Sequence, residues 1–181
     1  MKIGDRILQR WRIAKAAPWI KRNGRLLDVG CADGAIFKQL SDRISGGVGI
    51  DPDVAKPEQC AGGLLVPGFF PENLPDAQTY DAITMLAVLE HIPQAAQAKL
   101  AADCFQYLNP GGRLIITVPS PFVDHILSIL KTLRIVDGMS LEEHYGFKPA
   151  DTRPIFETAK LRLIAHRRFQ LGLNHLFVFE K

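Results

Sequence analysis

Apolar residues in this chain follow two different periods. Within residues 3–20 they recur about one helical turn apart, with basic residues on the other faces, which predicts an amphipathic leading helix within residues 1–22. The apolar positions of this helix are Ile3, Ile7, Trp11, Ala14 and Pro18. The same period returns in residues 94–108 and 149–159, where it predicts two more helices.

Short apolar runs between these segments predict buried strands, because each run is apolar enough to be covered on both faces. They are residues 25–29, 47–50, 64–66, 81–86 and 113–118. The first run is followed by a glycine-rich turn and then by helix-forming residues 35–40. Near the end of the chain, residues 161–169 and 173–179 predict two paired strands. Strands that alternate with helices indicate an α/β fold with a parallel sheet.

The composition fits a single domain over residues 1–181, of which 47% are hydrophobic and 23% charged. No stretch reaches the roughly 18 consecutive apolar residues that a membrane span needs. The three cysteines are far apart and support neither a disulfide framework nor a zinc site. We therefore expect a cytoplasmic protein that binds no metal.

Positive charge is concentrated at the start of the chain. Residues 1–25 hold eight Lys or Arg and one Asp, a net +7 against +3 for the whole chain, which leaves −4 for residues 26–181. Clustered cations attract nucleic acid or anionic lipid headgroups, and a solvated helix face is the alternative. Because no basic patch with interleaved aromatic residues continues beyond this region, we expect no nucleic-acid partner. A weak contact of the basic helix with a membrane surface stays open.

The turn after the first strand has the sequence Asp28-Val-Gly-Cys-Ala-Asp-Gly34. Its two glycines leave room for a flat ligand, and the first N–H groups of the next helix face that space. A dinucleotide site prefers G-x-G-x-x-G, but Ala32 stands where the second glycine would be. Asp28 would repel a diphosphate, whereas it suits an ammonium group. Asp51, at the end of the second strand, can bind both hydroxyls of a ribose. This pattern favours a zwitterionic nucleoside with a sulfonium group.

These segments together resemble class I S-adenosylmethionine-dependent methyltransferases, and within them the small-molecule group that includes quinone-biosynthesis and glycan methyltransferases. The matching segments are LLDVGCADG, GIDPD, YDAITMLAVLEHIP, LNPGGRLIITVPSP and the terminal strand pair. The resemblance implies a Rossmann-like, seven-stranded, mostly parallel sheet with an antiparallel last strand and helices on both faces. It also implies that S-adenosylmethionine lies across the carboxyl ends of the first four strands, beside an acceptor pocket.

By motif position, the resemblance implies that Asp28 helps to hold the methionine amine, that the turn passes beneath the ligand and that Asp51 binds the ribose. The expected cofactor-binding set is Asp28, Gly30, Cys31, Gly34, Asp51, Pro52, Phe69, Phe70, Met85 and Leu86. Relatives often have an aspartate for the adenine amine where this chain has Phe69 or Phe70. One of these rings stacks on the purine, or both pack in the core.

Three residues are candidates for acting on the acceptor. His91 follows the fourth strand, and it serves as a general base, orients the acceptor or forms a structural hydrogen bond. Residues 119–149 correspond to the segment that forms a substrate lid in such enzymes, and an apolar stripe over residues 122–139 predicts a helix in it. This segment also contains His144 and Tyr145, which face the substrate or form an exposed loop.

We therefore expect a methyltransferase that moves a methyl group from S-adenosylmethionine to an oxygen, nitrogen or carbon atom of a small molecule. Transfer from a sulfonium is an in-line displacement, in which the protein mainly aligns the reacting atoms. Two alternatives stay open. The chain is a cofactor-binding protein without catalysis, or it is a nicotinamide-dependent oxidoreductase, which Asp28 and Ala32 disfavour.

Overall fold

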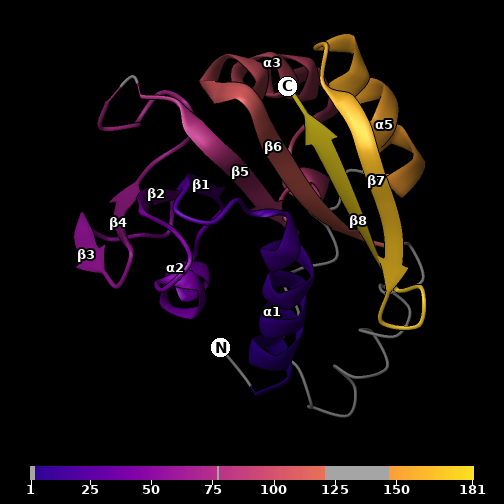
Figure 1. Cartoon of the computed structure of the whole chain (residues 1–181). Helices are drawn as coiled ribbons and strands as arrows, with labels where there is room; N and C mark the ends of the chain where they lie inside the picture. The colour runs from indigo at the N-terminus through magenta and orange to yellow at the C-terminus, as the bar shows by residue number, and fades with distance from the viewer. Residues whose placement is uncertain (1–2, 77, 121–146) are drawn as a thin grey trace.

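A twisted sheet runs through the centre of the molecule (Figure 1). The computed structural model describes residues 3–76, 78–120 and 147–181, and in this part the sheet has eight strands in the order β3-β4-β2-β1-β5-β6-β8-β7. Five central strands pair in parallel. They are β1 (Arg25–Val29), β2 (Gly46–Asp51), β4 (Gly63–Pro67), β5 (Tyr80–Leu86) and β6 (Leu108–Pro119).

Antiparallel pairs complete both edges of the sheet. Strand β8 (Asn174–Glu180) is antiparallel to β6 and to β7 (Arg162–Phe169), so β8 is the reversed strand that the resemblance implied. The expected number of seven strands is wrong by one, because β3 (Glu58–Cys60) pairs antiparallel with β4. This short, largely exposed segment has no apolar pattern, and its backbone hydrogen bonds to β4 alone make it a strand.

Helices cover both faces of the sheet, as expected (Figure 1). Helices α1 and α2 lie on one face, and α3 and α5 lie on the other. The helices of the described part are α1 (Ile3–Ala16), η1 (Ala17–Trp19), α2 (Ala35–Leu40), η2 (Leu89–His91), α3 (Gln94–Tyr107) and α5 (Pro149–Thr158). The predicted helix at residues 122–139 and most of the expected lid at residues 119–149 lie outside the described residues.

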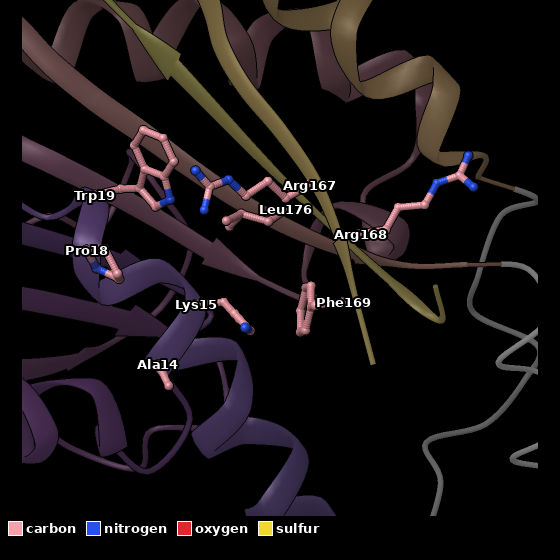
Figure 2. Close-up of a pocket in the computed structure, with 8 residues that line it drawn as sticks. All are labelled: Ala14, Lys15, Pro18, Trp19, Arg167, Arg168, Phe169 and Leu176. Carbon is pink, nitrogen blue, oxygen red and sulfur yellow. The ribbon is translucent and has the colours of Figure 1, made fainter. Parts of the chain in front are cut away.

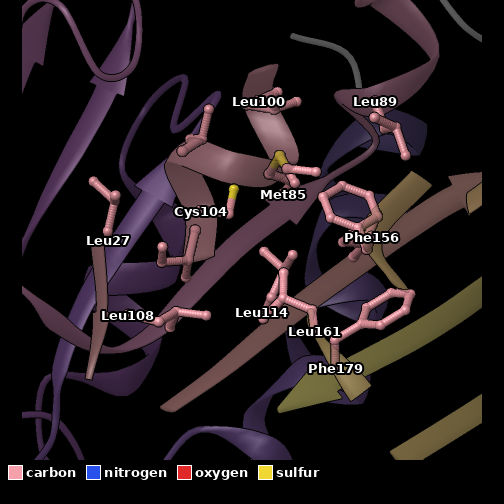
Figure 3. Close-up of a cluster of buried hydrophobic side chains, with 14 of the residues drawn as sticks. Leu27, Met85, Leu89, Leu100, Cys104, Leu108, Leu114, Phe156, Leu161 and Phe179 are labelled. Carbon is pink, nitrogen blue, oxygen red and sulfur yellow. The ribbon is translucent and has the colours of Figure 1, made fainter. Parts of the chain in front are cut away.

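Two layers of apolar side chains hold these helices to the sheet. On the α3 and α5 face, Met85 and Leu100 pack near the rings of Phe156 and Phe179, whose centroids are 5.3 Å apart (Figure 3). The layer under α1 and α2 includes Phe37, which is completely buried. Within the described residues, no helix is long and apolar enough to cross a bilayer.

The stripe that predicts the leading helix is not the face that packs on the sheet. Ile7 and Trp11 are about half exposed, at 51% and 54%. Helix α1 instead buries Ile13 and Ala16, followed by Ile20 just after η1. Because these buried positions also recur about every helical turn, α1 has two apolar stripes, and the pattern alone does not show which one faces the core.

Two alanine substitutions in α1 test which stripe carries the packing. Ile13→Ala should lower the free energy of unfolding by about 2–5 kcal/mol, the range for truncating a buried aliphatic side chain. Trp11→Ala removes a larger side chain that is half exposed, and it should change the stability by no more than about 0.5 kcal/mol. Urea unfolding followed by circular dichroism measures both. A larger loss for Trp11→Ala would show that α1 packs through the outer stripe.

Candidate functional site

The carboxyl ends of β1, β2, β4 and β5 meet at one edge of the sheet. Strand β1 has β2 on one side and β5 on the other. The chain therefore runs from β1 to β2 on one side of β1, and from β4 it crosses to β5 on the other side. Ligands of open α/β sheets bind at such a switch point, outside the carboxyl ends of the strands. Asp28 lies near the end of β1, and Asp51 is the last residue of β2.

The turn after β1 has a left-handed backbone at several positions. The φ angles are +76° at Gly30, +45° at Ala32 and +66° at Gly34. A Cβ on Gly30 would lie 2.4 Å from Val88 Cγ2, and one on Gly34 would lie 2.9 Å from Leu65 Cδ1. Backbone conformation and protein packing therefore both require glycine at these two positions. The sequence pattern explains the two glycines only by the room that they leave for a ligand.

The Asp51 carboxylate joins the end of β2 to this turn. Its Oδ2 accepts a hydrogen bond from the Ala32 N–H at 2.8 Å, and its Oδ1 accepts one from the Asp53 N–H at 2.9 Å. The Gly30 N–H also donates to the Ile50 carbonyl at 2.8 Å. A carboxylate has about four acceptor positions, so Asp51 keeps capacity for two ribose hydroxyls.

Asp28 forms a buried pair with Thr84. The two residues are opposite each other in the parallel pairing of β1 with β5, and Thr84 Oγ1 donates to Asp28 Oδ1 at 2.6 Å. Burial raises the pKa of Asp28 to about 7, the Thr84 hydrogen bond opposes this shift, and the charge of Asp51 adds to it. Sequence analysis missed Thr84, whose only signal was a hydroxyl in the apolar run of β5.

Helix α1 is connected to the same turn through Asp33. The Gln9 side chain donates to Asp33 Oδ1 at 2.9 Å, and this oxygen also accepts a bond from the Ala35 N–H at 3.3 Å. Asp33 thus bonds within the first turn of α2 and also holds α1 beside the site. Nothing in the sequence around Gln9 indicated this contact.

The other expected cofactor residues differ in the exposure of their side chains. Cys31 and Met85 are 3% and 0% exposed, and their side chains belong to the apolar layers (Figure 3 shows Met85). Burial also raises the pKa of the Cys31 thiol, so this thiol stays neutral. Leu86 is half-buried against the α1 and α2 layer, and Pro52 is exposed just beyond β2.

The two phenylalanines after β4 have different surroundings. The Phe70 ring packs against the α3 side of the core and meets the Tyr107 ring edge to face, with centroids 5.4 Å apart. The Phe69 ring is 66% exposed, while its N–H donates to Asn73 Oδ1 at 2.9 Å. Of the two rings, Phe69 is the one available to a planar ligand.

His91 ends η2, immediately beyond β5. Its N–H donates to the Val88 carbonyl at 2.9 Å, and the Val88 side chain lies against Gly30, so η2 lies beside the turn after β1. The other two acceptor candidates, His144 and Tyr145, lie outside the described residues. In the described ranges, no group of three His, Cys, Asp or Glu side chains could hold a metal ion.

Residues 5–170 match the family model of the methyltransferase domain. The chain belongs to this methyltransferase family. A probable S-adenosylmethionine-dependent methyltransferase of Mycolicibacterium smegmatis is 29% identical over 75% of the chain and 56% of its own length. The ubiquinone biosynthesis O-methyltransferase of Saccharophagus degradans is 34% identical to this chain over 77% of the chain and 64% of that protein. A second such enzyme, from Nitrosococcus oceani, is 29% identical over 70% of the chain and 58% of its own length. The chain thus spans about three-fifths of these curated relatives.

Solved structures show the same fold. The N-methyltransferase NodS of Bradyrhizobium japonicum superimposes with a TM-score of 0.69 at 14% identity and covers 99% of both chains. The magnesium protoporphyrin IX methyltransferase of Synechocystis, solved with bound S-adenosylhomocysteine, has a TM-score of 0.69 at 15% identity and covers 97% of this chain and 84% of its own. These likenesses show that the sheet is Rossmann-like, as the sequence predicted.

The residues at the sheet edge fit S-adenosylmethionine. The nearly buried Asp28 favours a ligand with an ammonium group and would repel the diphosphate of a nicotinamide dinucleotide, whereas Asp51 suits the hydroxyls of a ribose. The exposed Phe69 ring supplies a flat apolar surface for a purine. This site therefore supports the methyltransferase cofactor and not the oxidoreductase alternative.

Asp28→Asn should weaken S-adenosylmethionine binding about 10- to 150-fold, because the charge-assisted bond to an ammonium group is lost. It should also be more stable than wild type above about pH 7. The folded wild type keeps a proton on Asp28 that the unfolded chain releases, so its stability falls as the pH rises from the ordinary pKa of 3.8 to about 7. Calorimetry and thermal unfolding measure the two effects.

Asp33→Asn is the matched control for this prediction, since it removes an exposed charge from the same turn and keeps an oxygen for Gln9. This variant should leave affinity and its pH dependence nearly unchanged. If Asp28→Asn and wild type bind the cofactor equally at every pH, Asp28 does not hold the amine.

Proposed function

We propose that this chain transfers the methyl group of S-adenosylmethionine to a hydroxyl oxygen of a small molecule. The observation that carries the proposal is the pair of nearly buried carboxylates at the ends of β1 and β2, which suits a cationic nucleoside at the switch point of the sheet. The preference for oxygen is supported by the two curated O-methyltransferases, which are 34% and 29% identical to the chain.

Each part of the cofactor has a matching group at this edge. Asp28 holds the ammonium group, while Thr84 fixes the direction of its carboxylate through the 2.6 Å hydrogen bond. Asp51 binds the ribose hydroxyls from a position set by the Ala32 and Asp53 N–H groups. Phe69 stacks on the purine, and the main chain from Gly30 to Gly34 lies beneath the ligand. Cys31, Pro52, Met85 and Leu86 contribute through backbone or shape.

The bound cofactor supplies an activated methyl group on a sulfonium. The protein then has to place an oxygen in line with the carbon–sulfur bond, and such alignment can lower the barrier by about 7–11 kcal/mol. His91 lies beyond β5, beside the turn that follows β1, where its imidazole can accept the hydroxyl proton or orient the acceptor. His144 and Tyr145, in the expected lid, are further candidates for contact with the acceptor.

A turnover assay with S-adenosylmethionine tests the reaction. The full chain should form S-adenosylhomocysteine with phenolic or other hydroxyl-bearing acceptors, and Asp28→Asn should reduce this rate at subsaturating cofactor about 10- to 150-fold, in line with its loss of affinity. Matched amine-bearing acceptors serve as the comparison. Transfer to the amines alone would show that the acceptor atom is nitrogen. Cofactor binding without transfer to any acceptor would show that the chain is a cofactor-binding protein without catalysis.

His91→Ala should lower kcat while the dissociation constant of S-adenosylmethionine stays within a few fold. A loss of about 100-fold or more, together with loss of the low-pH limb of the rate, indicates a general base, and a smaller loss with an unchanged pH profile indicates orientation. His91→Gln tests whether a neutral hydrogen-bonding side chain restores orientation. Thermal unfolding is measured alongside, and equal turnover in a stable His91→Ala protein would make His91 structural.

A further inference from the structure

The outer stripe of α1 combines apolar side chains with cations. Ile7 and Trp11 are two of the four large hydrophobic residues that are strongly exposed in the described part of the chain. The stripe continues over Ala14 and Pro18, which are also exposed. On its flanks lie three exposed cations, which are Arg6, Arg10 and Lys15. A helix with an exposed tryptophan between arginines and lysines is typical of helices that lie in a lipid headgroup layer.

The stripe leads into a pocket between α1, η1 and the last two strands. This pocket has a volume of about 200 Å³ and an apolar floor that includes Phe169 and Leu176 (Figure 2). Lys15 points into it from the helix. Arg167 extends toward Trp19 of η1, and its guanidinium carbon lies 5.3 Å from the centroid of the Trp19 ring. A phosphate on an apolar chain would meet both charge and apolar surface here.

The hairpin between β7 and β8 extends this surface. Its tip carries Leu171, which is completely exposed and lies two residues beyond the pocket residue Phe169. Three of the four strongly exposed large hydrophobics, Ile7, Trp11 and Leu171, are therefore on α1 or at this hairpin tip. The fourth, Phe69, belongs to the cofactor site.

We propose that the outer stripe of α1 and the adjoining pocket form a docking surface for an anionic membrane. Cations draw the helix to negative headgroups, and Trp11 and Ile7 then enter the headgroup layer. Nucleic acid would use the cations but would gain little from Ile7 or Leu171, so a lipid surface accounts for more of the observations. The proposal does not depend on methyl transfer, because none of these residues belongs to the cofactor site.

Co-sedimentation of the full chain with vesicles tests this surface. The protein should bind vesicles of phosphatidylcholine mixed with phosphatidylglycerol, should not bind phosphatidylcholine alone, and should be released by salt. Trp11 fluorescence, measured in a Trp19→Phe background, should shift to shorter wavelength on binding. Trp11→Ala should weaken binding at least tenfold. The variant with Arg6→Gln, Arg10→Gln and Lys15→Gln should lose about 100-fold, since each cation near an anionic surface adds about fivefold.

The matched control removes three exposed cations elsewhere, with Lys56→Gln, Lys99→Gln and Lys160→Gln. It has the same net charge as the first triple variant, and it should keep nearly wild-type binding. Circular dichroism and turnover in solution should stay unchanged in both triple variants. Equal losses in the two variants would show attraction by net charge alone and overturn the proposal. Absence of vesicle binding, or tight binding of an oligonucleotide that Trp11→Ala leaves unchanged, would also overturn it.

Discussion

The carboxylate of Asp51 holds together the edge of the sheet on which the site depends. By accepting a hydrogen bond from the Ala32 N–H, it keeps the turn after β1 against the end of β2. Ala32 has a left-handed backbone, which is unfavourable for a residue other than glycine. That turn sets the start of α2 and brings Gly30 against Val88, next to η2 and His91. The ends of β1 and β2 and the segment that carries His91 are thus linked through one short turn.

Burial of Asp28 makes the same edge electrostatically costly. Asp28 is buried beside a second carboxylate, and a pKa of about 7 shows that its charged form is poorly accommodated in the folded protein. Thr84 offers a single hydrogen bond to the charge, which offsets only part of the cost of burial. Destabilisation of this kind is common where a charged ligand is to be bound, because the ligand supplies the missing opposite charge.

Helix α1 has a different task on each of its sides. Its inner side packs Ile13 and Ala16 on the sheet, and Gln9 reaches Asp33 in the turn after β1. Its outer side presents Trp11 and the flanking cations. Because one rigid helix carries both sides, α1 connects the outer stripe to the turn after β1 through the Gln9 side chain.

The sequence by itself determined the alternation of strands and helices, because buried strands and amphipathic helices are local patterns. The reversed strand β8 and the methyltransferase family followed from the resemblance carried by the motif from Asp28 to Gly34 and its companion segments. The tertiary structure decided what depends on packing between distant segments. It paired Asp28 with Thr84, separated the exposed Phe69 ring from the packed Phe70 ring and turned one of two apolar stripes of α1 outward. It also added β3, whose polar residues become a strand only because β4 supplies backbone partners. These features depend on which surfaces meet in the folded chain. The spacing of residues within one segment does not show which distant segment that segment packs against.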